Sequence, residues 1–273
     1  MSKFISVADK VVLVTGAAGI IGGTLAEAFL EDGARVVLTD LNHTALLEKH
    51  AALLERLPTD RYLLRAADIT EEEDVTACVK SAVAKWGRID VLINNAAIDA
   101  KFDREHADTF NESRFENFPL DTFQRSVEVN MIGTIRMTQH VVREMLRTGG
   151  GSIINLASTY SLVAPNQDLY DFGTGTVNFK PVDYVATKSF IPNYTRYLAT
   201  FYAKNGIRCN TVVPHAIFND HGEKFLKNFR PLSPMQRMSR RDELIGPFIL
   251  LASDASTYMT GSTVVVDGGW TAW

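Results

Sequence analysis

Short apolar runs alternate with longer amphipathic stretches along most of the chain. The runs are rich in valine, isoleucine and leucine, a pattern typical of strands that are buried on both faces of a parallel sheet. Strands are predicted at residues 10–15, 34–39, 61–66, 89–93, 152–158, 207–213 and 263–266. Helices are predicted between them, at residues 24–30, 43–57, 71–86, 121–147, 184–205 and 241–252. This alternation predicts one α/β domain of the Rossmann type over residues 1–273, a doubly wound parallel seven-stranded sheet with helices on both faces.

Three polar segments without clear periodicity interrupt the alternation, at residues 98–119, 159–183 and 215–240. A loop of this length inside a compact domain is usually functional or mobile. The first two leave the predicted sheet at the carboxyl ends of its strands, where ligands bind in such sheets, and the third has the character of a lid. We expect all three to be substrate loops, and their polarity favours a substrate that is larger and more hydroxylated than a simple alcohol.

Composition narrows the class of protein. Hydrophobic residues make up 46% of the chain and charged residues 22%, as in soluble globular proteins. The net charge of −4 and the lack of a basic run argue against a nucleic-acid partner. Cys78 and Cys209 have no metal-like spacing, so we expect no metal site and two buried thiols. The amino terminus has no signal-peptide pattern and no apolar run is long enough to span a membrane, which predicts a cytoplasmic protein without a membrane partner.

A glycine-rich turn, residues 15–23, follows the first predicted strand and leads into a helix. Such a turn brings backbone N–H groups and a helix N-terminus to a pyrophosphate, although a purely structural turn is the alternative. Asp40 ends the second strand, where a carboxylate can bind both ribose hydroxyls of NAD and would repel the 2′-phosphate of NADP. The alternative is that Asp40 caps the helix that begins near His43. We expect the cofactor to be NAD.

Tyr184 and Lys188 are four residues apart, which on a helix places the phenol and the ammonium on one face. A free tyrosine ionises near pH ~10, and a nearby positive charge favours the phenolate. The pair is therefore a candidate proton shuttle for the interconversion of an alcohol and a carbonyl. By itself this spacing is also common on solvated helix faces.

Taken together, seven motifs in order resemble the short-chain dehydrogenase/reductase family over nearly the whole chain. They are Thr15-Gly-x-x-Gly-x-x-Gly22, Asp68-Ile69, Asn94-Asn-Ala-Ala97, Asn130, Ser158, Tyr184-x-x-x-Lys188 and Asp267-Gly-Gly269. The resemblance implies an NAD(P)-dependent oxidoreductase that acts on CH–OH groups. It also implies a homo-oligomer, a tetramer or a dimer, formed through the helices near 121–147 and 184–205.

The resemblance implies a role for each matching residue. Tyr184 is the expected acid/base, and Lys188 is expected to lower its pKa and bind the nicotinamide ribose. Ser158 is expected to hold the substrate oxygen, and Asn130 to anchor a water of the proton relay or, alternatively, only to kink its helix. The implied cofactor-binding residues are Gly16, Ala18, Gly19, Ile20, Ile21, Asp40, Leu41, Asp68, Ile69, Asn95, Ala96, Ala97, Tyr184, Lys188, Pro214, Ala216 and Ile217. For Asp68 the alternative is a helix cap in which Thr70 and Glu73 form a capping box.

Several features depart from the family pattern. The glycine spacing is that of the longer, sugar-nucleotide-modifying branch, whereas the other motifs and the length fit the shorter branch. The wide separation of Ser158 and Tyr184 makes Tyr170 a rival base, although position 174 holds a threonine in place of a lysine. Pro192 predicts a local kink in the Tyr184 helix. His215 replaces the usual glycine after the sixth strand, where it could titrate, bind substrate or only pack in its loop.

The two long loops also resemble those of the flagellin modification protein A subgroup, which is associated with bacterial surface sugars such as legionaminic acid. This resemblance implies an amino-sugar phosphate or nucleotide-sugar substrate. The residues that could meet a phosphate, or be ordinary solvated charges, are Lys101, Arg104, Arg114 and Lys180. Two other functions are compatible with the sequence: a sugar epimerase, isomerase or dehydratase that retains its NAD, and a non-catalytic NAD-binding partner protein.

Overall fold

A computed structural model describes residues 5–99, 112–171 and 178–273 of the chain. Within these ranges seven strands form one parallel sheet in the order β3-β2-β1-β4-β5-β6-β7, which confirms the predicted doubly wound fold. The strands are β1 (Val11–Thr15), β2 (Arg35–Asp40), β3 (Tyr62–Ala66), β4 (Val91–Asn94), β5 (Gly151–Leu156), β6 (Ile207–Pro214) and β7 (Thr263–Val266). Each begins and ends within about two residues of its prediction.

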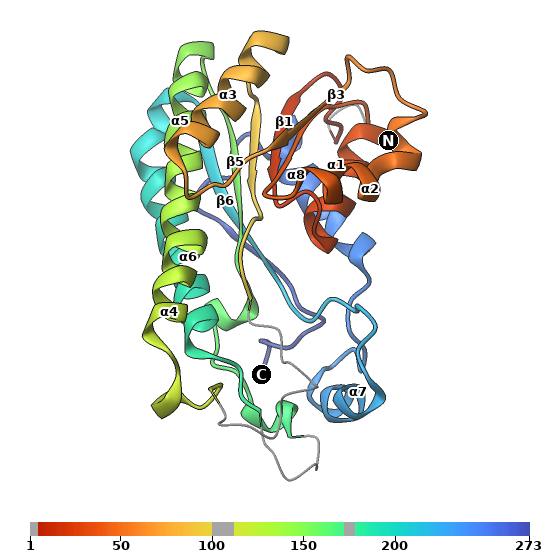
Figure 1. Cartoon of the computed structure of the whole chain (residues 1–273), viewed down its shortest axis with the longest axis vertical. Helices are drawn as coiled ribbons and strands as arrows, with labels where there is room; N and C mark the ends of the chain where they lie inside the picture. The colour runs from red at the N-terminus through yellow and green to blue at the C-terminus, as the bar shows by residue number, and fades with distance from the viewer. Residues whose placement is uncertain (1–4, 100–111, 172–177) are drawn as a thin grey trace.

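The helices cover both faces of the sheet (Figure 1). One face carries α1 (Ile20–Glu31), α2 (His43–Leu54) and α8 (Ile245–Ala252), and the other carries α3 (Glu72–Trp86), α4 (Leu120–Val127), α5 (Thr134–Thr148) and α6 (Val182–Tyr202). Each face has its own apolar cluster, built from the buried sides of these helices and from alternate residues of the strands. Burial of this apolar surface is the main force that holds the layers together.

Two predicted helices differ in detail from the structure. The helix predicted at 121–147 consists of α4 and α5, joined by a π-helical turn at Glu128–Gly133 that contains Asn130. The Tyr184 helix, α6, is continuous through Pro192. Among the described residues, no helix combines the length and the apolar character that a membrane crossing requires.

The third polar segment, 215–240, contains a helix that the sequence pattern did not indicate, α7 (Glu223–Phe229). Its Phe229 is buried in a small separate core together with Leu169, Tyr170 and Met238. The weak local pattern did not indicate this helix, because part of the core that buries it comes from Leu169 and Tyr170 of the second loop. Short 3-10 turns at Thr159–Ser161 and Gln167–Tyr170 give the second loop part of its structure.

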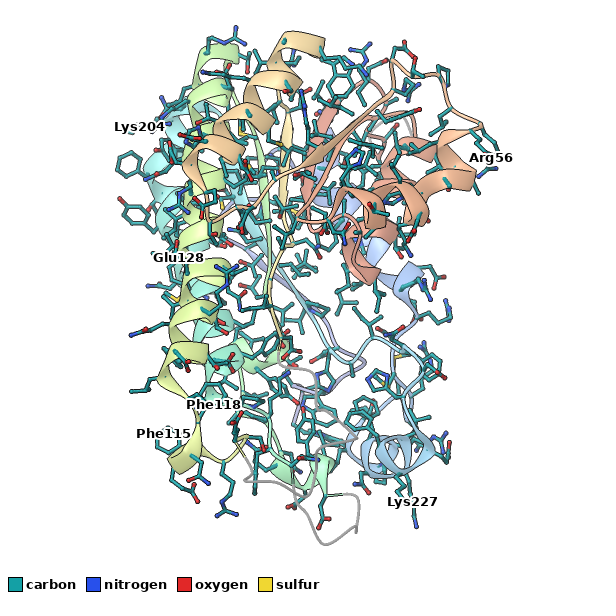
Figure 2. The ribbon with its side chains drawn as sticks, in the orientation of Figure 1. Arg56, Phe115, Phe118, Glu128, Lys204 and Lys227 are labelled. Carbon is teal, nitrogen blue, oxygen red and sulfur yellow. The ribbon has the colours of Figure 1, made fainter. Side chains whose placement is uncertain are left out.

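The described parts of the polar segments lie at one end of the molecule, beyond the carboxyl ends of the strands (Figure 2). Phe115, Phe118 and Lys227 lie at this end, whereas Arg56 and Lys204 lie at the opposite end. This arrangement places the candidate substrate loops over the edge of the sheet where ligands bind in folds of this class.

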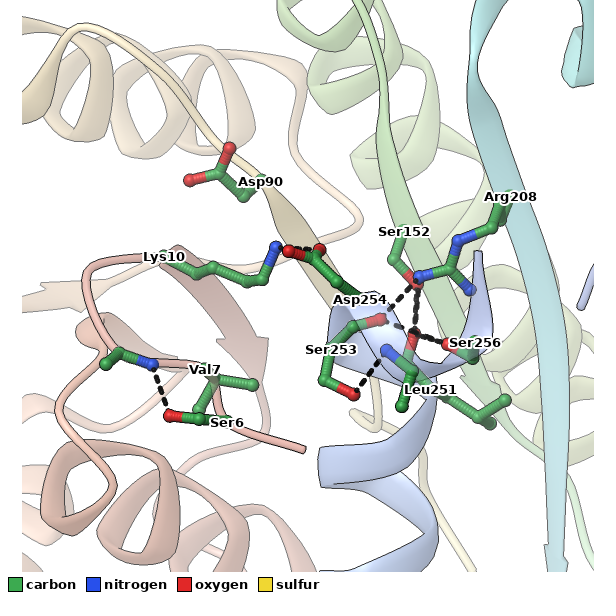
Figure 3. A network of polar contacts seen from close by, with 12 residues as sticks. Ser6, Val7, Lys10, Asp90, Ser152, Arg208, Leu251, Ser253, Asp254 and Ser256 are labelled. Atoms are coloured by element: carbon green, nitrogen blue, oxygen red, sulfur yellow. Dashed lines mark hydrogen bonds and ion pairs between the residues drawn. The ribbon is translucent and has the colours of Figure 1, made fainter. Parts of the chain in front are cut away.

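The opposite, amino edge of the sheet is joined by a network of polar contacts (Figure 3). The Arg208 guanidinium donates to the Leu251 carbonyl oxygen at 2.8 Å, and Ser152 Oγ donates to the same oxygen at 2.8 Å. Lys10 forms an ion pair with Asp254 at 2.8 Å. These contacts connect the starts of β1, β5 and β6 to the end of α8, so this edge is fixed without the participation of the candidate site.

Candidate active site

Tyr184 and Lys188 lie one turn apart near the start of α6, as their four-residue spacing predicts. The Lys188 side chain is buried, and its Nζ donates a hydrogen bond to the Leu156 carbonyl oxygen at 2.9 Å. The same Nζ lies 5.8 Å from the centroid of the Tyr184 ring. Burial lowers the pKa of Lys188 to about 8, so the ammonium is mostly charged at neutral pH and its charge acts beside the phenol.

Ser158 lies just beyond β5, and its side chain is hydrogen-bonded to Tyr184. Its Oγ also accepts a hydrogen bond from the Tyr160 N–H at 3.3 Å, which caps the 3-10 turn that follows. The turn fixes the position of the serine hydroxyl. Three of the four predicted catalytic residues are thus brought together at the carboxyl edge of the sheet.

The surroundings of Tyr184 act on its ionisation in opposite directions. Burial raises the pKa of the phenol, the negative charge of Asp99 raises it further, and the hydrogen bond from Ser158 lowers it. Burial therefore keeps the phenol protonated at neutral pH even with Lys188 and Lys180 nearby, and further positive charge beside it would favour the phenolate. An oxidised nicotinamide ring carries such a charge.

Asn130 acts on the chain around the catalytic residues. Its Oδ1 accepts from the Ile98 N–H at 2.8 Å, and its Nδ2 donates to the Ile98 carbonyl oxygen at 3.0 Å and to Thr187 Oγ1 at 3.0 Å. The π-helical turn points this amide toward the segment after β4 and toward α6, next to Lys188. Asn130 thus both marks a helix irregularity and ties two parts of the site together. Its role in holding a water stays a prediction.

The glycine turn packs closely against the end of β4. Thr15 Oγ1 accepts hydrogen bonds from the N–H groups of Asn95 and Ala96, both at 3.0 Å. Gly16 has φ +68°, and a Cβ there would lie 2.8 Å from the Asn95 amide nitrogen. A Cβ at Gly22 would lie only 2.2 Å from the Gly16 carbonyl oxygen. The glycines are therefore required for the closed turn that precedes the N-terminus of α1.

Asp40 lies against this turn. Its Oδ2 accepts a hydrogen bond from the Ala18 N–H at 3.0 Å. The cap of α2 is Asn42, whose side chain accepts from the Ala45 N–H at 3.1 Å, so the alternative that Asp40 caps this helix is wrong. The carboxylate and the free N-terminus of α1, whose N-cap Gly19 has no side chain, fit the ribose and pyrophosphate of a dinucleotide. Leu41, the next predicted cofactor residue, is largely exposed.

The Asp68 carboxylate is hydrogen-bonded to Thr70, two residues further along the chain. Its Oδ1 accepts from both the N–H and the hydroxyl of Thr70, at 2.8 and 2.7 Å. The predicted capping box of Thr70 and Glu73 does not form, because α3 has Glu71 as its N-cap and no side-chain cap bond. The Ile69 side chain is buried against Gly133, so only the backbone of Ile69 is placed to meet a cofactor.

The chain after β6 holds the lid segment to the sheet. The His215 N–H donates to the Val266 carbonyl oxygen at 3.1 Å, and the Ser239 N–H donates to the Ala216 carbonyl oxygen at 3.0 Å. Ile217 continues this pairing through a β-bridge with Ser239. The predicted cofactor residues Pro214, Ala216 and Ile217 therefore lie where the sheet passes into the lid.

His215 packs as an aromatic core residue. Its ring centroid lies 4.2 Å from that of Trp270 and 5.5 Å from that of Phe229, and its Nδ1 lies 2.5 Å from Thr159 Oγ1. Burial lowers its pKa to about 4, so the ring is neutral over the physiological range. Of the roles left open by the sequence, the packing role is the one that this geometry favours.

Tyr170, the rival base, is buried, and its hydroxyl lies 2.9 Å from that of Tyr160. Burial raises its pKa, and the neighbouring Tyr160 raises it further. Tyr184, and not Tyr170, has Lys188 one turn away on the same helix. Position 174 lies outside the described residues. The geometry favours Tyr184 as the proton donor and acceptor.

Lys180 and Asp99 form a pair at the site that the sequence did not reveal. The Lys180 Nζ lies 4.0 Å from the centroid of the Tyr184 ring and forms an ion pair with Asp99. The Lys180 side chain is buried, so the interpretation of a solvated charge was wrong. The two residues are 81 positions apart, and no local pattern indicates their pairing.

The other candidate phosphate contacts behave differently. Arg114 forms an ion pair with Glu116 at 2.7 Å, and its guanidinium carbon lies 5.5 Å from the centroid of the Phe179 ring. Half of its side chain is exposed. Lys101 and Arg104 lie outside the described residues.

Comparison with known proteins identifies the family. A family model described as enoyl-(acyl carrier protein) reductase matches residues 16–271. A short-chain type dehydrogenase/reductase from Mycobacterium marinum has 28% identical sequence, a TM-score of 0.83, and full coverage of both chains. The chain belongs to the short-chain dehydrogenase/reductase family. It is an enzyme of the NAD(P)-dependent type that acts on CH–OH groups.

Two curated short-chain dehydrogenases illustrate the relatives. D-threitol dehydrogenase of Mycolicibacterium smegmatis is 32% identical over 96% of this chain and 93% of its own length. NAD-dependent glycerol dehydrogenase of Listeria innocua is 31% identical over 98% of this chain and 96% of its own length. The similarity extends over the whole Rossmann domain, including the segments around the candidate site.

Proposed function

We propose that this short-chain dehydrogenase transfers hydride between NAD and a hydroxyl or keto group of a sugar or polyol. The observation that carries the proposal is the cluster of Ser158, Tyr184 and Lys188 at the carboxyl edge of the sheet, the edge where the glycine turn bonded to Asp40 also lies. The polyol relatives and the polar loops support the substrate class. Asp40 at the glycine turn supports NAD over NADP, because a carboxylate there repels a 2′-phosphate.

The residues divide the proton chemistry between them. A nicotinamide dinucleotide, held by its pyrophosphate and ribose at the glycine turn and Asp40, would supply the hydride acceptor or donor. Tyr184 takes the hydroxyl proton of an alcohol during oxidation and returns it to the carbonyl oxygen during reduction. Lys188 stabilises the phenolate by its charge, and Ser158 holds the substrate oxygen next to the phenol. Asn130 keeps the backbone at Ile98 in position beside them.

The phosphorylated or nucleotide-linked sugars implied by the flagellin modification subgroup are a narrower form of this proposal. Less in the described residues supports a phosphate, because Asp99 neutralises Lys180 and Glu116 neutralises Arg114. Such sugars, including amino-sugar phosphates of surface-glycan biosynthesis, belong in the substrate panel beside the free polyols.

We also propose that the enzyme is a homo-oligomer. Apolar side chains on the outer helices support this part of the proposal: Tyr197 and Phe201 on α6 are 60% and 59% exposed, and Leu146 on α5 is 43% exposed. Covering these side chains with a second copy would remove apolar surface from water.

The deciding experiment follows NADH formation by absorbance with a panel of polyols, free hexoses, hexose phosphates and nucleotide sugars. NAD and NADP are compared, and the Tyr184→Phe variant is compared with the wild type. We expect NADH formation that depends on substrate and falls by about 10²- to 10⁴-fold in Tyr184→Phe, the usual contribution of a general acid–base residue.

Tyr170→Phe is the matched control, since it removes the rival hydroxyl. Full turnover by Tyr184→Phe, or loss only in Tyr170→Phe, would contradict the assignment. A sugar changed in its NMR spectrum without net NADH would favour the enzyme that retains its NAD. Tight NAD binding with no change in any sugar would favour the non-catalytic role.

A further inference from the structure

The pair of Lys180 and Asp99 lies directly at the catalytic phenol. The Lys180 side chain is only 7% exposed, and its Nζ lies over the face of the Tyr184 ring, 4.0 Å from the centroid. Its ion-pair partner is Asp99, in the segment after β4. The Asp99 charge also acts on Tyr184 and on Lys188. The pair therefore belongs to the site, although the proton chemistry above does not use it.

Both residues are held by side chains from other elements. Gln167 accepts a hydrogen bond from the Lys180 N–H at 2.8 Å and donates to the Lys180 carbonyl oxygen at 3.3 Å. Asn130 holds both backbone groups of Ile98, the neighbour of Asp99. A buried lysine on a loop would otherwise have many conformations, so these contacts preorganise the pair.

The pair has hydrogen-bonding capacity that the described residues do not use. An ammonium has three donors, and the only acceptor for Lys180 Nζ among these residues is Asp99. The Asp99 carboxylate has about four acceptor positions and its side chain is 47% exposed. Lys180 also lines a cavity of about 370 Å³, together with Gln167, Phe179, Val182 and Val185. Lys180 therefore contacts the Tyr184 ring and also borders this cavity, whose lining residues do not include Tyr184 or Asp99.

The charges of the pair cancel, which favours a neutral ligand. A hydroxyl group both donates and accepts, so one hydroxyl can use a free donor of Lys180 and a free acceptor of Asp99. With the substrate oxygen at Ser158 and Tyr184, a hydroxyl on the neighbouring carbon would extend toward Lys180, whose Nζ lies over the Tyr184 ring. A simple alcohol would leave the buried ammonium without this partner, which is costly.

We propose that Lys180 and Asp99 bind the hydroxyl group next to the carbon that is oxidised, and so select vicinal diols over simple alcohols. This inference rests on the proposed function, and it names the substrate feature that the site recognises. The competing explanation is that Lys180 only tunes the Tyr184 phenol by its charge over the ring. A second competitor is that Lys180 binds a phosphate.

The test measures kcat/KM for cyclohexane-1,2-diol and for cyclohexanol, and for the best polyol of the panel and its analogue that lacks the neighbouring hydroxyl. We expect the wild type to prefer each diol. In Lys180→Met the ratio of the two kcat/KM values should fall about tenfold or more, because a hydrogen bond to a charged group is lost. Asp99→Asn should lower the same ratio, and it tests the subsite independently where Lys180→Met fails to fold. Lys204→Met, an exposed lysine at the opposite end of the molecule, is the matched control.

The outcomes separate the explanations. An equal loss with diol and simple alcohol would show tuning of the phenol or a structural role, and would overturn the subsite. A loss in Lys180→Met confined to sugar phosphates would assign the lysine to a phosphate and would also overturn it. Turnover of cyclohexanol without any diol preference in the wild type would overturn the subsite and leave the dehydrogenase intact. Absence of all turnover would overturn both proposals.

Discussion

The two edges of the sheet both hold buried or half-buried cations, but they satisfy them differently. At the amino edge, the Arg208 guanidinium donates to the carbonyl oxygens of Leu251 and Ser253 (Figure 3). It also donates to the carbonyl oxygen of Met259. At the carboxyl edge, Lys188 Nζ has one acceptor among the described residues, the Leu156 carbonyl oxygen, and Lys180 has the carboxylate of Asp99.

The difference separates structural from functional polar groups. Buried polar groups are normally hydrogen-bonded, and an unused donor costs free energy. A fold retains such a donor where something outside the protein completes it. We infer that unused hydrogen-bonding capacity beside Tyr184 marks the positions of cofactor and substrate, whereas the three contacts of Arg208 connect β6 to the end of α8 and the segment after it.

The largest expected effect is at the carboxyl edge. In Lys188→Met, kcat/KM should fall about a thousandfold, because the phenolate of Tyr184 loses the charge that stabilises it. The free energy of unfolding should change little, since the buried ammonium has a single acceptor in the described residues. NADH formation and urea unfolding check the two parts. If Lys188→Met retained its activity, or lost much of its stability, the distinction between functional polar groups at the carboxyl edge and structural ones at the amino edge would be wrong.

The same substitution at the amino edge should have the opposite result. Arg208→Met should lower the free energy of unfolding by about 3 kcal/mol, because the hydrogen bonds from a charged donor to the Leu251, Ser253 and Met259 carbonyl oxygens are lost. The kcat/KM of the folded protein should equal that of the wild type. Arg56→Met is the control, because it removes an exposed guanidinium that, among the described residues, donates a side-chain hydrogen bond only to the Ala52 carbonyl oxygen of α2. A catalytic defect in Arg208→Met would show that the edges are coupled.

The sequence was sufficient to predict those features that depend on residues close together in the chain. Parallel strands follow from continuous apolar runs, and Tyr184 and Lys188 meet because four residues make one helical turn. It was not sufficient where the partner is distant in the chain. Asp99 pairs with Lys180 across 81 positions, and α7 is buried by residues of the second loop. The predicted capping box at Thr70 is a local prediction that was wrong. The Thr70 hydroxyl donates to the Asp68 carboxylate and does not cap α3.

His215 tests how far the comparison extends. His215 lies at the carboxyl edge, and its Nε2 is buried without a hydrogen-bond partner among the described residues. If an unused hydrogen-bonding atom were sufficient to mark the site, His215 would belong to it. Its stacking on Trp270 and Phe229 and its low pKa indicate instead a neutral ring that stabilises the lid.

The expected effect of His215 is therefore on stability as a function of pH. Its pKa is about 4 in the fold, and an unfolded histidine titrates near pH ~6.5. As the pH falls, the unfolded chain binds the proton first, so stability that is present above pH ~6.5 is lost on the way to pH ~4. From pH ~7.5 to pH ~5 the wild type should lose about 2 kcal/mol more than His215→Gln. Urea unfolding at several pH values measures this difference. If wild type and His215→Gln had the same pH dependence of stability and His215→Gln had a lower kcat, the imidazole would be a substrate-binding group. Unused hydrogen-bonding atoms at the carboxyl edge would then mark the site in this case as well.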